Sequence, residues 1–185
     1  MSTTSIALII VAIVIAAGLI YYFARKRKSD ELRARFGPEY DRAVDDAGSR
    51  QRAEADLAER RKRVESLAIK PLSPEDREKY LENWQKVQTE FVDDPKSAVV
   101  HADVLVVDVM KGRGYPVADF EQRAADISVD HPVVVDNYRA AHDIAVNQAA
   151  GKASTEDLRQ AMVHYRTLFE DLIAEAEPAP AKAQS

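Results

Sequence analysis

The stretch Ser154–Leu172, STEDLRQAMVHYRTLFEDL, decides the fold class. Ser154 is followed three residues later by Asp157, which is the pattern of a helix N-cap and its reciprocal acid. Apolar side chains then recur every three or four residues, the period of one helix face. The apolar positions are Leu158, Met162, Tyr165, Leu168, Phe169 and Leu172. This segment predicts a long amphipathic helix that buries one side.

The same start signals recur upstream, beyond Pro71. Ser73-Pro74 and Asp94-Pro95 each place a capping side chain before a proline suited to the first helical turn, and Asp119 caps a shorter segment. Between them, valines follow a wide stripe over residues 99–109, for which we expect a buried helix rather than a strand. Residues 71–176 are therefore predicted to form an all-α bundle whose core includes Trp84, Tyr138 and Met162. The Pro/Ala-rich end, 177–185, is predicted to be disordered.

Residues 25–70 are predicted to form a basic flank and a charged helical stalk. Gly37-Pro38 ends one helix and starts the next, and Gly48 ends the second. An apolar stripe through Phe36 and Tyr40 requires something to cover it. The segment 50–67 is rich in charge and places acid before base at i,i+4, as in Glu59/Arg63. We expect it to be a solvated spacer helix, with a coiled coil as the weaker alternative.

Before the stalk lies an uninterrupted apolar run, residues 6–24, IALIIVAIVIAAGLIYYFA. As a helix it is about 28 Å long, close to the ~30 Å hydrocarbon core of a bilayer. A short uncharged tail, residues 1–5, precedes it, and the basic residues Arg25, Lys26, Arg27 and Lys28 follow it directly. This asymmetry predicts a transmembrane helix in the cell membrane with its N-terminus outside and a cytoplasmic C-terminal domain. A cleaved signal peptide is the alternative, but the basic n-region that it needs is missing. The four basic residues suit anionic lipid headgroups.

Charge and cysteine content exclude several classes of protein. The chain has no cysteine, so disulfide frameworks and thiol chemistry are excluded. Its net charge is −5, and the segment 71–185 carries twelve basic against twenty-one acidic side chains. Phosphate-rich polymers are repelled by such a domain, so we expect no nucleic-acid partner.

Three stretches carry a resemblance to a known group. Residues 35–40 (RFGPEY), 115–132 (YPVADFEQRAADISVDHP) and 155–165 (TEDLRQAMVHY) are similar to a family of short bacterial single-pass membrane proteins with no assigned function. The resemblance covers most of residues 30–173. It implies a bacterial envelope protein, and it implies no functional residues.

No catalytic or cofactor motif is found. The residues three before each histidine are not glutamates, so the paired Glu-x-x-His metal pattern of helical bundles is absent from the sequence. Gly112-x-Gly114 lacks the further residues of a nucleotide loop. We therefore predict no cofactor, no metal and no catalytic residue, although His142 and His164 lie on helices that could bring them together.

One connecting segment carries side chains of the kinds that bind partners. It contains Tyr115, Phe120, Glu121, Arg123, Asp126 and His131. Because binding residues often lie on connections between helices, one interpretation is a partner groove there. The alternative is that Phe120 is a core residue and Arg123 pairs locally.

The sequence favours a membrane-anchored interaction or scaffold module that localises a partner protein at the bilayer. Two other functions stay open. One is a membrane-bound hydrolase or transferase with an Asp/Glu/His site between helices, and the other is a secreted or periplasmic helical domain.

Overall fold

The computed structural model describes residues 3–174, without the side chains of residues 3–12 and Val14. In this range it contains eight α-helices and no strand, which confirms the all-α class. The chain divides into two compact units, Met1–Ala58 and Glu59–Ser185, so the division falls within a helix rather than at Pro71. The tail 177–185, predicted to be disordered, lies outside the described residues, and so do the first two residues of the predicted tail 1–5.

The first unit is formed by α1 (Thr3–Phe36), α2 (Pro38–Ala47) and the first half of α3 (Arg50–Glu65). The helix breaks lie where the sequence predicts them. Gly37 has φ 48° and is followed by Pro38 in the first turn of α2. Gly48 has φ 63° and ends that helix. Both backbone conformations favour glycine, and the chain turns at each end of α2.

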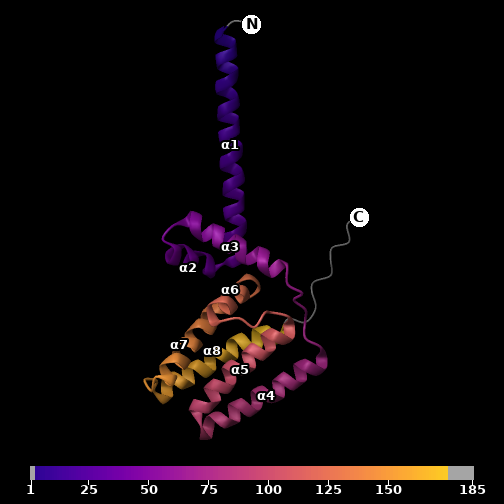
Figure 1. The fold of residues 1–185 in the computed structure, drawn as a ribbon, viewed down its shortest axis with the longest axis vertical. Coiled ribbons are helices and arrows are strands. Elements are labelled where there is room, and N and C mark those ends of the chain that lie inside the picture. Colours follow the sequence, from indigo (N-terminus) through magenta and orange to yellow (C-terminus); the bar gives the residue numbers. More distant parts are fainter. Residues whose placement is uncertain (1–2, 175–185) are drawn as a thin grey trace. The chain divides into compact units, whose positions relative to one another are not determined.

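This unit has a small core of its own, which corrects the expectation of a solvated spacer. α2 and the first turns of α3 lie beside the C-terminal end of α1 (Figure 1). Their apolar stripes are buried; the core residues are Leu32, Phe36, Tyr40, Ala43, Ala53 and Leu57. The sequence stripe through Phe36 and Tyr40 is therefore covered by neighbouring segments of the same chain.

The second unit contains α4 (Pro74–Asp93), α5 (Pro95–Arg113), α6 (Phe120–Asp130), α7 (Val135–Ala149) and α8 (Thr155–Ala174). The predicted caps form. The side chain of Ser73 accepts from the amide of Asp76 at 3.0 Å, and Ser154 accepts from Asp157 at 3.2 Å. Satisfying these otherwise unpaired amides fixes where each helix begins.

The four long helices lie side by side in the order α7, α8, α5 and α4 (Figure 1), and each packs on the next. At the centre the rings of Trp84 and Phe169 stack with centroids 4.7 Å apart. Tyr138, Tyr165 and Phe169 are completely buried. The predicted core residues Trp84, Tyr138 and Met162 are all buried, as expected.

The valine-rich segment forms a helix, α5, as predicted. Val99, Val106 and Val109 are fully buried. The stripe is narrower than the sequence suggests, because Val100 and Val104 are exposed. A helix with two close neighbours, α4 and α8, buries only the faces that they cover.

Within the described residues, no helix combines the length and the apolar character that crossing a bilayer requires. The predicted span, residues 6–24, lies in large part outside them, since the side chains of residues 6–12 and Val14 are not described.

Candidate functional site

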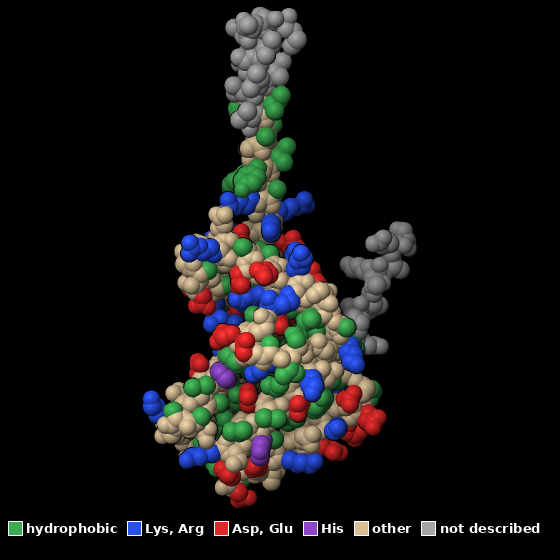
Figure 2. Space-filling model, viewed as in Figure 1, with side chains coloured by type: hydrophobic (Ala, Val, Ile, Leu, Met, Phe, Trp, Pro, Cys, Tyr) green, Lys and Arg blue, Asp and Glu red, His purple; other side chains and the backbone are tan. Residues whose placement is uncertain are grey.

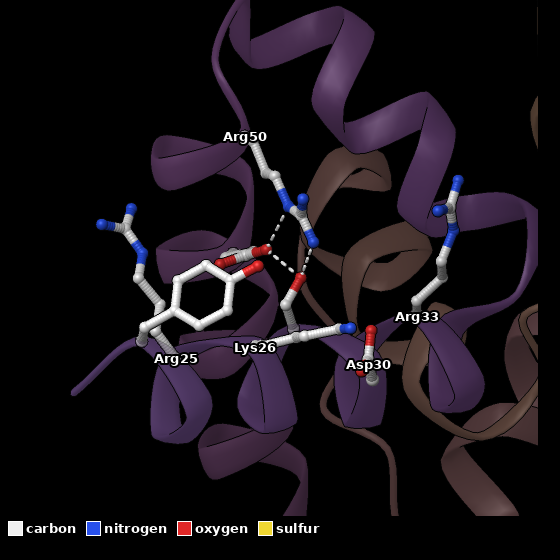
Figure 3. A pocket seen from close by; sticks show the side chains of 8 residues that line it. Arg25, Lys26, Asp30, Arg33 and Arg50 are labelled. Atoms are coloured by element: carbon white, nitrogen blue, oxygen red, sulfur yellow. Dashed lines mark hydrogen bonds and ion pairs between the residues drawn. The ribbon is translucent and has the colours of Figure 1, made fainter. Parts of the chain in front are cut away.

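The candidate site is a hollow of about 540 Å³ in the first unit, between α1 and the start of α3. Six of its lining residues lie on α1 with spacings of three, one, three, one and three, so they form one helix face. They are Tyr22, Arg25, Lys26, Ser29, Asp30 and Arg33. Arg50 and Glu54 complete the lining from α3 (Figure 3).

A hydrogen-bond cluster fixes α3 against α1 at the base of this hollow. Oε1 of Glu54 accepts from the hydroxyls of Ser29 at 2.5 Å and Tyr40 at 2.8 Å, and from Nε of Arg50 at 2.8 Å. Arg50 also donates to the hydroxyl of Ser29. Because these side chains come from all three helices of the unit, the cluster sets the position of Arg50 over α1 (Figure 3).

The hydrogen bonds of the cluster favour the charged forms of both Glu54 and Arg50. Burial alone would raise the pKa of the Glu54 carboxyl, but the hydrogen bonds from Ser29, Arg50 and Tyr40 together lower it below its ordinary value. The hydrogen bond from Arg50 to Glu54, and a second one to Tyr40, raise the pKa of the guanidinium. Glu54 is therefore an anion whose charge is already satisfied within the protein.

The other cations of the hollow are open to solvent. Arg25 and Lys26 are exposed, and neither forms an ion pair with any residue that the structure describes. Arg33 is held by Asp41 at 2.7 Å, and its guanidinium lies 5.4 Å from the centre of the Tyr40 ring. The lining carries four cations, Arg25, Lys26, Arg33 and Arg50, against the two carboxylates Asp30 and Glu54. The hollow is thus net positive and suits an anion.

The structure divides the predicted basic flank in two. Arg25 and Lys26 line the hollow. Arg27 lines a neighbouring hollow with Lys26 and Asp30, and Lys28 is exposed outside both. Sequence analysis missed the contribution of Ser29, Asp30, Arg33, Arg50 and Glu54. The helical spacing from Tyr22 to Arg33 was visible in the sequence, but the return of Arg50 depends on the two glycine turns.

The six residues of the predicted partner groove do not form an exposed surface. Tyr115, Asp126 and His131 are buried, Phe120 and Arg123 are half-buried, and only Glu121 is exposed. Phe120 packs on the core, its ring 4.9 Å from that of Tyr138. Arg123 donates to the hydroxyl of Tyr138 at 2.9 Å. These side chains therefore act within the bundle, which leaves Glu121 as the one fully accessible member.

The buried members serve as internal connections. The carboxylate of Asp126 accepts from Arg63 at 2.7 Å and from Gln122 at 2.9 Å. The sequence spacing suggested that Arg63 pairs with Glu59, but Arg63 pairs with Asp126 instead. Tyr115 donates to Asp130 at 2.8 Å.

A histidine–carboxylate pair of the kind that a hydrolytic site uses does form. Nδ1 of His131 lies 2.5 Å from the carboxylate of Asp171. The side chain of His131 is only 1% exposed, so a substrate does not reach it in this structure. The pair connects the end of α6 to α8, and it is not placed for catalysis.

His142 and His164 have separate partners and do not form a metal site with each other. The ring of His142 stacks on Phe120 at 3.6 Å, and Nδ1 of His164 lies 2.7 Å from the side-chain oxygen of Asn137. In the described part of the chain, no group of three or more potential ligands could hold a metal ion.

Comparison with protein-family models, curated proteins and solved structures finds no match for this chain. The resemblance of residues 35–40, 115–132 and 155–165 to a bacterial membrane family therefore stays a prediction.

Proposed function

We propose that this protein is a membrane-anchored helical module that holds its second unit, and a partner protein bound there, at the cytoplasmic face of the cell membrane. Residues 6–24 of α1 would cross the bilayer, and Arg25 to Lys28 would stay at the cytoplasmic surface.

The observation that carries the proposal is the abrupt change in exposed side chains along α1. From Ile13 to Phe23 every large apolar or aromatic side chain with a described environment is between 52% and 70% exposed. The next four residues are all basic and exposed. Figure 2 presents this change as green side chains followed by blue ones. Water is a poor solvent for so long an exposed apolar segment, whereas lipid chains would cover it.

The aromatic and basic residues are placed as an interface requires. Tyr21, Tyr22 and Phe23 end the apolar run, where rings suit the headgroup level. Arg25 to Lys28 follow, while residues 1–5 carry no charged side chain. This excess of positive charge on one side favours a cytoplasmic position for everything after residue 24.

The mechanism that follows is confinement. A membrane anchor restricts the second unit to a thin layer, and this raises the effective concentration of its partner there. The acidic side chains of residues 71–185 favour a partner with a basic face. No catalytic step is needed for such a role.

The test uses the absence of cysteine from the chain. A single cysteine at Ser185 in the full chain, expressed in intact cells, should be protected from a membrane-impermeant maleimide until the cells are lysed. A matched cysteine at Ser2 should be labelled in intact cells. The chain should also stay in the membrane pellet after alkaline carbonate washing. Release by carbonate would contradict the anchor, and the opposite labelling pattern would contradict the orientation.

A further inference from the structure

We propose that the hollow between α1 and α3 binds the headgroup of one anionic phospholipid, with the phosphate on Arg25 and Lys26 and headgroup hydroxyls toward Asp30. This inference rests on the proposed membrane anchor and specifies which lipid feature the anchored unit recognises.

The depth of the residues along α1 supports a lipid as the ligand. If the hydrocarbon ends near Ala24, then Arg25 and Lys26 lie within the first turn beyond it. The headgroup layer of one leaflet is about 5–7 Å thick, and four residues of helix rise ~6 Å. Arg25 and Lys26 are therefore at the level of lipid phosphates. Asp30 lies about 9 Å beyond Ala24, just past the headgroup layer, but helix side chains tilt toward the N-terminus, which brings its carboxylate back toward the outer end of a headgroup.

The open cations identify the anion. Arg25 and Lys26 are exposed in the lining of the hollow and form no ion pair within the described residues. The guanidinium of Arg25 can bind a phosphate through two parallel hydrogen bonds. Arg33 and Arg50 are already oriented by Asp41 and Glu54. They add positive potential but are not the first contacts. A phosphate would thus join a site in which Arg33, Arg50 and Glu54 already have partners.

Asp30 favours hydroxyl groups on the headgroup. Its carboxylate is exposed and forms no ion pair within the described residues, and it lies on the same face of α1 as Lys26 (Figure 3). A second phosphate near it would be repelled, whereas hydroxyls would donate to it. The net positive lining disfavours a headgroup that carries its own ammonium. The ligand class is therefore a monoanionic phospholipid with a polyol headgroup, of which phosphatidylglycerol is the simplest.

The test is a lipid titration of the purified full chain in dodecyl maltoside micelles, followed by native mass spectrometry, which counts the lipids bound. The probes are phosphatidylglycerol, phosphatidylmethanol, which has the same charge without hydroxyls, phosphatidylethanolamine and phosphatidylcholine. Glycerol phosphate in free solution serves as the soluble phosphate ester. We expect one tightly bound phosphatidylglycerol and weaker binding of the other four.

The chain provides a matched pair of variants. R25Q/K26Q and R27Q/K28Q each remove one arginine and one lysine from neighbouring positions, but only the first pair lines the hollow. Each basic residue near a lipid surface contributes about fivefold to affinity, so R25Q/K26Q should weaken the first phosphatidylglycerol by about twenty-five-fold. R27Q/K28Q should weaken that lipid much less, because neither residue lines the hollow. D30N should reduce the preference for phosphatidylglycerol over phosphatidylmethanol.

Equal losses in the two double variants would overturn the site, because a merely basic helix would behave that way. Binding of phosphatidylethanolamine or phosphatidylcholine as tight as that of phosphatidylglycerol would also overturn the site. An unchanged preference of D30N for phosphatidylglycerol over phosphatidylmethanol would overturn the role of Asp30. Tight binding of free glycerol phosphate would make the ligand a soluble phosphate ester instead of a lipid. The anchor is tested separately by carbonate extraction, so a chain that stays in the membrane but shows equal losses refutes only this inference.

Discussion

The two units use their buried residues for different purposes. The second unit closes a large core with apolar and aromatic side chains, including the stacked rings of Trp84 and Phe169, and its buried Asp126 and His131 pair inside the protein. The first unit has a smaller apolar core and adds a polar cluster around Glu54 beside an open, basic hollow. Hydrophobic burial provides stability without direction, whereas hydrogen bonds fix the positions of particular groups. We therefore expect the larger apolar core to make the second unit the more stable one, and we propose ligand binding for the first.

The largest expected effect is in the second unit, from Phe169→Ala. The ring is completely buried against Trp84, so its removal should lower the free energy of unfolding by about 3–5 kcal/mol. Trp84 is the one tryptophan in the chain, and its fluorescence follows denaturant unfolding of this unit. Val92→Ala is the control, because Val92 is 82% exposed and should change stability by less than about 0.5 kcal/mol. Similar losses in both variants would mean that the stacked rings are not the centre of the core.

A smaller effect is expected in the first unit from Tyr40→Phe. This change keeps the buried ring but removes the hydroxyl that donates to Glu54 at 2.8 Å. Hydrogen bonds to charged groups contribute about 1.5–3 kcal/mol, so the opening free energy of α2 and the start of α3 should fall by up to that amount. Hydrogen exchange of the full chain, read peptide by peptide, measures it.

The matched control is Tyr21→Phe, since Tyr21 is 67% exposed. Protection of α5 and α8 should stay unchanged in both variants, because the two units have separate cores. Loss of protection across both units in Tyr40→Phe would show that they unfold together, and the comparison between them would then fail.

The third prediction concerns pH and acts through the same cluster. The pKa of Glu54 is lowered in the folded chain because, against the effect of burial, Ser29, Arg50 and Tyr40 donate to its carboxylate. The stability that it contributes is therefore fully present above the ordinary carboxyl pKa, about 4.3, and is lost as pH falls through the lower folded value. Exchange protection of α2 and α3, corrected for intrinsic rates, should decrease over this range. Glu54→Gln should be less protected at pH 7 and should lose much of the acid dependence; an unchanged dependence would contradict the role of Glu54.

The sequence correctly predicted the helix caps and helix breaks, because these features depend on residues close together in the chain. Ser73, Asp94, Asp119 and Ser154 all cap the helices they were expected to cap, because the hydrogen bond reaches an amide only three residues away. The valines alone were also compatible with a strand, and the cap at Asp94 with the placement of Asp103 and Asp108 indicated the helix α5. The breaks at Gly37 and Gly48 were visible for the same local reason.

The features that the sequence did not predict depend on distant partners. Arg63 has an acid four residues before it, yet it pairs with Asp126, which is 63 residues away. Tyr115 and His131 have the residue types of a binding surface, but packing buries them. The segment 50–67 was expected to be solvated because its composition is charged. The chain turns at Gly37 and Gly48, however, and these turns bring the start of α3 back to α1. The four basic residues Arg25 to Lys28 were predicted to act as one group, but only Arg25 and Lys26 lie on the helix face that lines the hollow.

The smallest expected effect is the most informative about the hollow. In the R25Q/K26Q chain we expect the opening free energy of the first unit, measured by hydrogen exchange in micelles without anionic lipid, to change by less than about 0.5 kcal/mol. Both side chains are exposed and without ion pairs in the described part of the chain, so folding gains little from them. Adding phosphatidylglycerol should then increase protection around the hollow in the unmodified chain and in R27Q/K28Q, but not in R25Q/K26Q, because a ligand stabilises only the state that binds it. A large loss of stability in R25Q/K26Q without lipid would instead assign these cations to folding, and the division of roles between the two units would no longer hold.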